Sequence, residues 1–195
     1  MVVEKAKRKE NILRVAQGLF SRFGLAKTTI ADIARRARMG KASIYYYFRN
    51  KEAIFQEVID KEGRELRQKI LQAIRAERTP QRKIRAYVIT RASALKELAN
   101  YYTAFRDEYL EQYAFIEKAR QEYNAFEQQV IREILQEGMD QGMFQIEDVH
   151  LTAEAIVAAL KGLEYHWTIH VSLETIEKYV DTLLTILFKG IEKRG

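Results

Sequence analysis

Apolar side chains recur every three or four residues along nearly the whole chain, which is the spacing of amphipathic α-helices. These stripes predict helices over residues 5–23, 30–37, 41–47, 51–75, 80–100, 113–136, 149–170 and 172–193, with a short helix or irregular piece over 101–110. One proline and nine glycines in 195 residues leave few breaks in the pattern. We therefore predict an all-α fold of about nine helices.

Capping residues support these helix ends. Thr29 can cap the second helix, and Asp32, three residues later, can reach back to the Thr29 main chain to complete a capping box. Glycines are expected to end helices where a left-handed residue is needed. The other expected N-caps are Gly40, Asn50, Thr79 (before Pro80), Asp148 and Ser172, and the expected helix-ending glycines are Gly24, Gly138 and Gly142.

The stretch from Thr28 to Lys51 predicts two short helices separated by a tight turn. In the second of them Ile44 and Phe48 share the buried face at a spacing of four residues. Lysine, serine and three consecutive tyrosines are then left facing outward, which is unusual for an ordinary solvated surface. It suits a DNA groove, where phenol hydroxyls bond phosphates, rings contact thymine methyl groups and lysines neutralise charge.

At these residues the chain resembles the TetR family of one-component transcriptional regulators, from about Ile12 to Phe55. The resemblance implies a three-helix helix-turn-helix DNA-binding domain over residues 1–50 and a helical ligand-binding and dimerisation domain over 51–195. The chain departs from the family pattern at Arg38, Gly40 and Ala42, and Arg38 is expected to adopt a left-handed backbone. The matching residues are Phe20 to Gly24, Thr28 to Ile30, Ile33-Ala34, Ala37, Lys41 to Phe48 and Asn50 to Glu52.

The resemblance and the pattern together predict the partner, double-stranded DNA. We expect Thr29 to position a phosphate, Lys41, Ser43 and Tyr45 to approach base edges, and the following tyrosines and Lys51 to hold the DNA backbone. The predicted DNA-binding residues are Thr29, Gly40, Lys41, Ala42, Ser43, Tyr45, Tyr46, Tyr47 and Lys51.

Charge is divided unevenly along the chain. Residues 1–51 carry a formal charge of +10 and the remainder −4, within a total of +6. A basic head on a mildly acidic body is typical of a DNA-binding module joined to another domain. The first basic residues (Lys5, Lys7, Arg8 and Lys9) allow two interpretations: an arm that reaches phosphates or the minor groove, or a solubilising segment.

Other function classes find little support. The chain has no cysteine, which excludes disulfides, cysteine nucleophiles and thiolate metal sites. It shows no signal peptide and no apolar run near the roughly 20 residues of a membrane span, so we expect a cytoplasmic protein without a membrane partner. Neither a glycine-rich phosphate loop nor a nucleophile elbow is present, and we expect no enzyme activity and no cofactor. A remaining alternative is an interaction protein that keeps the fold but binds DNA poorly.

The segment from residue 87 to 126 is rich in aromatic residues interspersed with charged ones, which suits a mainly apolar small-molecule site. The resemblance implies an effector bound within the helical body, and the lining favours a lipophilic or acyl compound. Most aromatic residues at helical spacing are simply core. The predicted ligand-binding residues are Tyr87, Tyr102, Phe105, Tyr123, Phe126 and Trp167.

The last two predicted helices are apolar on more than one face, so each must bury against two surfaces. The first has a face of small residues that would let another helix approach closely. The resemblance implies a two-fold homodimer through these helices, a palindromic operator, and a repressor released by its ligand. The predicted dimerisation residues are Ala155, Ala159, Gly162, His166, Val180, Leu184 and Leu187.

His166 and His170 stand four residues apart on one helix face, a spacing that metal ligands use. The favoured interpretation is two imidazoles at the dimer interface or pocket rim. The segment HWTIH also lacks the glutamate of the HExxH metalloprotease motif. We therefore predict no metal site.

Overall fold

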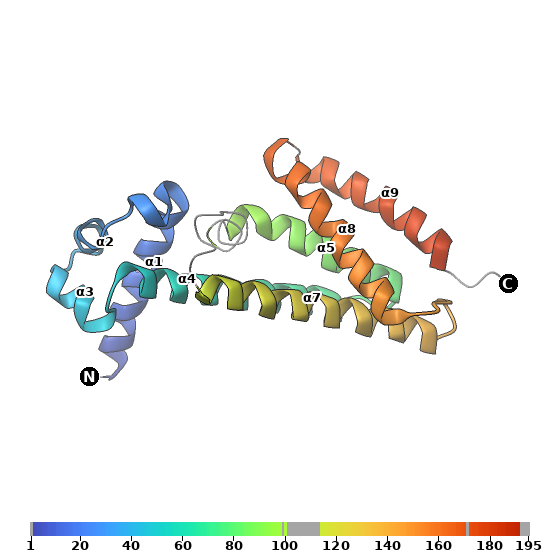
Figure 1. Ribbon diagram of the computed structural model, residues 1–195, viewed down its shortest axis with the longest axis horizontal. Coiled ribbons are helices and arrows are strands. Elements are labelled where there is room, and N and C mark those ends of the chain that lie inside the picture. Colours follow the sequence, from blue (N-terminus) through green and yellow to red (C-terminus); the bar gives the residue numbers. More distant parts are fainter. Residues whose placement is uncertain (1, 99, 101–113, 171, 192–195) are drawn as a thin grey trace. The chain divides into compact units, whose positions relative to one another are not determined.

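The computed structural model describes residues 2–98, 100, 114–170 and 172–191, and these residues form helices without a β-strand (Figure 1). The prediction of an all-α fold is confirmed. The predicted piece over residues 101–110 lies outside the described residues. The helices are α1 (Val2–Lys27), α2 (Ile30–Ala37), α3 (Lys41–Tyr47), α4 (Lys51–Arg75), α5 (Pro80–Glu97), α7 (Ala114–Asp140), α8 (Val149–His170) and α9 (Leu173–Ile191).

The predicted caps account for most of the helix starts. The Thr29 side chain accepts the Asp32 N–H, and the Asp32 carboxylate accepts the Thr29 N–H, so the capping box is confirmed. Main-chain N–H groups also donate to the other predicted side-chain caps, while Gly40 caps α3 through its extended backbone alone. These bonds run from Ala53 to Asn50 (2.8 Å), Arg82 to Thr79 (3.3 Å), Leu151 to Asp148 (3.0 Å) and Thr175 to Ser172 (3.2 Å).

Two helices differ from their predicted ends. Helix α1 begins at Val2 rather than Lys5 and resumes for one turn after Gly24, whose φ of 74° interrupts the helical geometry. Helix α7 continues through Gly138 to Asp140, so Gly138 does not end it, contrary to the prediction. Gly142, with φ of 69°, terminates the segment instead, and the Met143 N–H bonds back to the Gly138 carbonyl at 2.9 Å.

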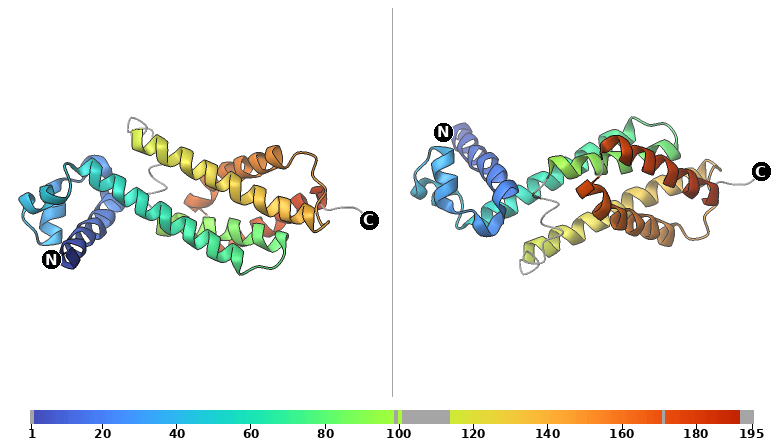
Figure 2. Two further views of the ribbon diagram at one scale, coloured as in Figure 1. Left: turned by 90° about the horizontal axis from the view of Figure 1, so that it is seen from below. Right: turned by 90° about the horizontal axis from the view of Figure 1, so that it is seen from above.

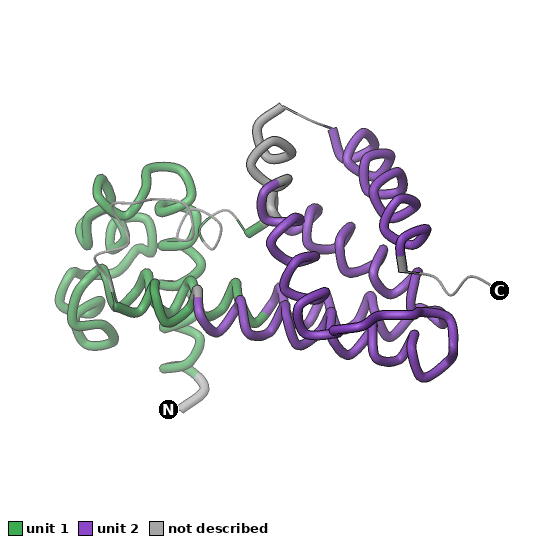
Figure 3. The backbone as a smooth tube through the Cα atoms, turned by 45° about the vertical axis from the view of Figure 1, so that its right-hand side comes forward, with its two compact units in different colours: residues 1–64, 98–119 green, residues 65–97, 120–195 purple. Residues whose placement is uncertain are grey.

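The chain divides into two compact units, residues 1–64 with 98–119 and residues 65–97 with 120–195 (Figure 3). The predicted boundary after residue 50 does not coincide with this division, because α4 is a single helix whose first half belongs to unit 1. The reason is apolar burial: Ile54, Phe55, Val58 and Ile59 on that half are at most 2% exposed.

In unit 1, α1 packs against α2, and α2 against α3 (Figure 2). The Phe20 ring of α1 meets the Phe55 ring of α4 edge to face, with centroids 5.1 Å apart. Buried Glu62 adds a polar tie, because its carboxylate accepts hydrogen bonds from Gln17 and Asn100, both at 2.8 Å. The helix-turn-helix is therefore mounted on two long helices.

In unit 2, α5 packs against α8 and α9 (Figure 1). Ile84, Ile131, Ala153 and Ile176 place fully buried side chains from four helices in its core. Within the described part of the chain, no helix is both long enough and apolar enough to cross a bilayer.

Candidate nucleic-acid interface

The turn between α2 and α3 sets the direction of α3. Arg38 has φ 55° and ψ 45°, the left-handed conformation expected from the sequence. The Met39 N–H then bonds to the Ala34 carbonyl at 2.9 Å and closes the end of α2. The Asn11 side-chain amide of α1 donates to the Ala37 carbonyl at 3.3 Å, which holds this turn on the first helix.

Helix α3 has one buried face and one open face. Ile44 and Phe48 are 0% and 3% exposed, which confirms their predicted inward position. Tyr45 and Tyr46 are 55% and 68% exposed, a high value for such large rings. Tyr47 is half-buried, and its ring packs edge to face on Tyr46 with centroids 5.0 Å apart. The remaining predicted contact residues Gly40, Lys41, Ala42 and Ser43 are exposed.

The basic start of the chain is helical and lies beside α3. The Lys5 ammonium stands 5.0 Å from the centroid of the Tyr46 ring, a cation–π contact. Lys9 stands 5.4 Å from the Phe48 ring centroid and pairs with Glu57 of α4 at 2.7 Å. Lys5 therefore adjoins the open face of α3, whereas Lys9 is paired with Glu57 beside the buried Phe48, and both interpretations of this segment stay open.

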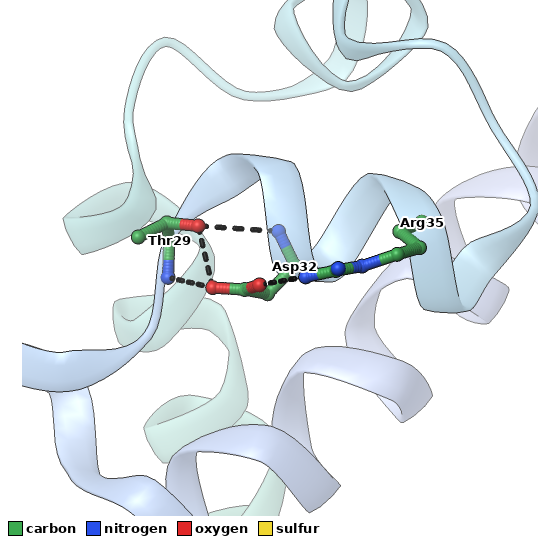
Figure 4. A network of polar contacts seen from close by, with 3 residues as sticks. All are labelled: Thr29, Asp32 and Arg35. Atoms are coloured by element: carbon green, nitrogen blue, oxygen red, sulfur yellow. Dashed lines mark hydrogen bonds and ion pairs between the residues drawn. The ribbon is translucent and has the colours of Figure 1, made fainter.

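Thr29 is engaged in capping α2 (Figure 4). Its hydroxyl donates to the Asp32 carboxylate and its N–H donates to the same oxygen, while Arg35 bonds the other carboxylate oxygen. These contacts, above all the Thr29 hydroxyl, lower the pKa of Asp32 below its ordinary value. Both donors of Thr29 are thus used in capping α2 in this structure, and its predicted phosphate contact stays a prediction.

Lys51 is placed differently from expectation. Its ammonium donates to the carbonyl oxygens of Leu25, Ala26 and Thr28 at 2.8, 3.3 and 3.3 Å. All three donors of the ammonium are thereby occupied. In this structure Lys51 therefore serves as a bracket between the start of α4 and the end of α1, and its predicted contact with the DNA backbone stays a prediction.

Three of the six predicted ligand-lining residues are described, all in unit 2. Tyr87 and Tyr123 are buried, Phe126 is half-buried, and the Tyr123 and Phe126 rings stack with centroids 6.4 Å apart. The Tyr87 hydroxyl donates to Glu127 at 2.6 Å. The side chains of Tyr102, Phe105 and Trp167 lie outside the described residues.

A buried ion pair accompanies these aromatics and was missed in the sequence. Arg91 and Glu127 meet at 2.5 Å, with side chains 4% and 0% exposed. The second Glu127 oxygen has no hydrogen bond with the residues that the structure describes, and the Lys161 ammonium lies 3.6 Å away. The signal was available, because both charged residues fall within apolar stripes of their helices.

The predicted dimerisation residues fall into two groups. Ala155, Ala159 and Gly162 are exposed on one face of α8, and Leu187 is half-buried on α9. Val180 and Leu184 are 1% and 8% exposed, so they belong to the core of the protomer and are unavailable to a partner, which corrects the prediction for these two. The large apolar residues exposed on α9 are Leu173, Tyr179, Leu183 and Ile186.

His166 and His170 lie in α8, but their side chains are outside the description. Among the described residues, no three histidine or acidic side chains gather as a metal site would require.

The family model for "bacterial regulatory proteins, tetR family" matches residues 12–58. The chain is 28% identical over 193 residues to the "probable acrEF/envCD operon repressor" of Escherichia coli K12, covering 93% of this chain and 85% of that protein.

Solved structures share the fold along most of the chain. A transcriptional regulator from Cytophaga hutchinsonii has a TM-score of 0.77 at 26% identity, covering 94% of this chain and 98% of that one. The regulator FadR from Bacillus subtilis, solved with stearoyl-CoA, has a TM-score of 0.72 at 21% identity, covering 90% and 96%.

Proposed function

We propose that this chain, a member of the TetR family of bacterial regulatory proteins and a DNA-binding transcriptional regulator, is a dimeric repressor that a lipophilic ligand releases from a palindromic operator. The observation that carries this proposal is the open face of α3, with two exposed tyrosines beside Lys41 and Ser43 on a basic unit. Its relatives are regulators, a class distinct from enzymes.

The proposed DNA contacts are assigned to the side chains that are exposed on the open face of α3. Lys41, Ser43 and Tyr45 approach base edges, and Tyr46 contacts the backbone with support from Lys5. The small side chains of Gly40 and Ala42 let the main chain approach the groove closely. Thr29 and Lys51 support these contacts by fixing the helices that carry them.

The proposed dimer explains two exposed apolar faces in unit 2. On α8, Leu151 is 63% exposed and continues into the small residues Ala155, Ala159 and Gly162 at helical spacing. On α9, Tyr179, Leu183 and Ile186 form a second such face. Faces of this kind are typical of contacts between protein chains. A two-fold pair would place two α3 helices about one DNA turn apart, roughly 34–36 Å.

A positive charge introduced on the exposed apolar face of α9 tests the proposed dimer. Ile186→Lys should give monomers in sedimentation at concentrations where the parent is dimeric, because it buries an ammonium in an apolar contact. Thr185→Lys adds the same charge at the neighbouring exposed position, which points away from that face, and should remain dimeric. Equal behaviour of the two variants would contradict the proposed interface.

The proposed effector site uses the aromatic side chains of unit 2. Tyr123 and Phe126 stack there, and the Arg67 guanidinium lies 5.6 Å from the Phe126 ring centroid, so apolar and polar groups that could contact a lipophilic body and a polar end lie side by side. The B. subtilis FadR structure holds stearoyl-CoA in the same fold, so acyl compounds are the class to screen first. Coupling between effector and DNA sites is typically about 1–3 kcal/mol, or roughly 5- to 150-fold in affinity.

Selection of bound DNA from a random pool at two salt concentrations tests the DNA-binding proposal. We expect an enriched palindrome whose affinity falls steeply with salt. Tyr45→Ala should lose the enriched sequence, while Glu133→Ala, at an exposed site on α7 that belongs to neither proposed interface, should retain it. Charge-dependent binding without enrichment would favour the interaction-protein alternative.

A further inference from the structure

Arg38 is held in a backbone conformation that suits glycine. Its φ of 55° makes it the one non-glycine residue with positive φ in the described part of the chain. The left-handed region is unfavourable for a residue with a Cβ atom, and glycine is the usual residue at this helix-ending position. A strained non-glycine residue that a fold nevertheless retains points to a function for its side chain.

The Arg38 side chain is exposed and makes no hydrogen bond or ion pair with the residues the structure describes. It borders two grooves of unit 1. The first, of about 510 Å³, lies between the start of α1 and the α2–α3 turn, and the second, of about 680 Å³, lies between the end of α1 and α2. The first is lined by Glu4, Lys7, Arg8, Asn11, Arg38, Met39, Gly40 and Ser43, and the second by Leu19, Phe23, Lys27, Thr28, Asp32, Arg35, Arg36 and Arg38.

Both grooves carry excess positive charge. In the first, the one acidic residue, Glu4, is paired with Arg8 at 2.8 Å, which leaves Lys7 and Arg38 without a counter-charge among its lining residues. In the second, the one acidic residue, Asp32, is engaged by Thr29 and Arg35. Ser43 brings the open face of α3 into the first groove. A groove with these donors next to a DNA-reading helix matches the phosphate backbone.

We propose that Arg38, together with Lys7, binds a backbone phosphate of the DNA strand that passes the first groove, and that the left-handed strain is the cost of directing its guanidinium there. The contact extends the DNA interface from α3 across the turn to α1. It positions the duplex without reading its sequence, since phosphates carry no base information. This inference rests on the proposed DNA-binding function.

Three variants of the full chain separate the effect of the Arg38 charge from the effect of its backbone strain. Arg38→Gln keeps a side chain in the left-handed position but removes the charge. Arg38→Lys keeps the charge, and Arg38→Gly removes both charge and strain. Affinity for the selected operator and for a random duplex, measured across salt concentrations, reports the phosphate contact, and thermal melting reports the strain.

We expect Arg38→Gln to weaken both duplexes by the same several-fold factor and to lower the salt slope by about 0.9 per protomer bound, with melting unchanged. Arg38→Lys should keep the parent slope, and Arg38→Gly should lose binding like Arg38→Gln while melting at a higher temperature. Arg78→Gln, an exposed arginine between α4 and α5 in unit 2, should match the parent in every measurement.

A parent-like salt slope in Arg38→Gln would overturn the inference, because the guanidinium would then contact no phosphate. A loss confined to the operator would also overturn it, in favour of base reading. The slope on the random duplex can be measured even if selection enriches no sequence. Failure of the operator proposal is thereby distinguished from failure of the Arg38 contact.

Discussion

The ammonium of Lys51, at the first residue of α4, donates to the main-chain carbonyl of Leu25, in the last turn of α1, at 2.8 Å. Two further carbonyls, of Ala26 and Thr28, lie at 3.3 Å. Carbonyl groups at a helix end carry partial negative charge and lack helical partners, so a cation there is stabilising. One side chain thus ties together the two long helices on which the helix-turn-helix is mounted.

Lys51→Met tests this bracket. Methionine keeps the apolar stem and removes the ammonium, so three carbonyl oxygens lose their donor. We expect the free energy of unfolding to fall by about 1–2 kcal/mol. Thermal melting of the parent and the variant would measure it, and the salt slope of DNA binding should stay close to that of the parent, because the ammonium contacts protein rather than phosphate.

Lys41→Met is the matched control, since Lys41 is exposed on the open face of α3. It should leave melting unchanged and weaken DNA binding. If Lys51→Met instead melted like the parent and lowered the salt slope, the result would support the contact between Lys51 and the DNA backbone that the sequence predicted.

The capping box of Thr29 and Asp32 leads to a prediction about the pKa of Asp32 and the pH dependence of stability. The Thr29 hydroxyl is the main cause of the lowered pKa of Asp32, so Thr29→Val should raise this pKa towards the ordinary value. A carboxyl whose pKa is lowered by folding binds fewer protons in the folded state. Its stabilising contribution is therefore present above the ordinary value of 3.8 and is lost as the pH falls through the lowered pKa.

Carboxyl NMR titration of both proteins measures the shift directly. Asp181 is an internal reference, because a hydrogen bond from Arg85 lowers its pKa and Thr29→Val does not touch that pair. An Asp32 pKa that is the same with and without the threonine hydroxyl would show that the capping bond contributes nothing to the shift.

Local signals in the sequence were reliable here because their causes are local. Thr29 and Asp32 are three residues apart, and the left-handed Arg38 was expected because the family that the chain resembles usually has glycine at this position. The role of Lys51 was not predictable in this way, since its carbonyl partners lie 23 to 26 residues earlier in the chain. Helical periodicity likewise showed that α9 is apolar on two faces but could not show that Val180 and Leu184 occupy the inner one.

Because Arg91 and Glu127 form a buried ion pair, we expect substitution of Glu127 alone to reduce stability strongly. Glu127→Ala removes the carboxylate that the Arg91 guanidinium contacts and leaves a cation in the protein interior. Loss of one partner of a buried pair typically costs about 3–5 kcal/mol of stability. Chemical denaturation should show a loss of this size, whereas Glu133→Ala, at an exposed site on the same helix, should change stability by less than about 0.5 kcal/mol.

Replacing both partners of the ion pair with apolar residues tests whether the loss in Glu127→Ala comes from the unpaired Arg91 charge. Glu127→Leu combined with Arg91→Met should recover much of the stability lost in Glu127→Ala, since apolar replacements of buried pairs are often neutral. A double variant as unstable as Glu127→Ala would mean that the stability comes from the other contacts of the two side chains, such as the Tyr87 hydrogen bond to Glu127, rather than from the ion pair.

At Gly138, inside α7, a side chain would collide with a neighbouring ring. A Cβ atom at this position would lie 2.1 Å from Cδ2 and 2.4 Å from Cε2 of Phe144, whose ring is buried and stacked on Phe188. Gly138→Ala should therefore destabilise the protein by about 1–3 kcal/mol through overpacking, despite the higher helix propensity of alanine. Gly18→Ala, in α1 with open space around its Cβ, should instead stabilise by about 0.5–1 kcal/mol.

The Phe144 ring can be tested as the cause of this loss. Phe144→Leu shortens the side chain that a Cβ at position 138 would strike, so the double variant Gly138→Ala with Phe144→Leu should be more stable than the sum of the single effects predicts. Such coupling is expected only between residues in contact. Strict additivity in denaturant titrations would show that the glycine is required for its backbone, because the ring would then have no part in the cost.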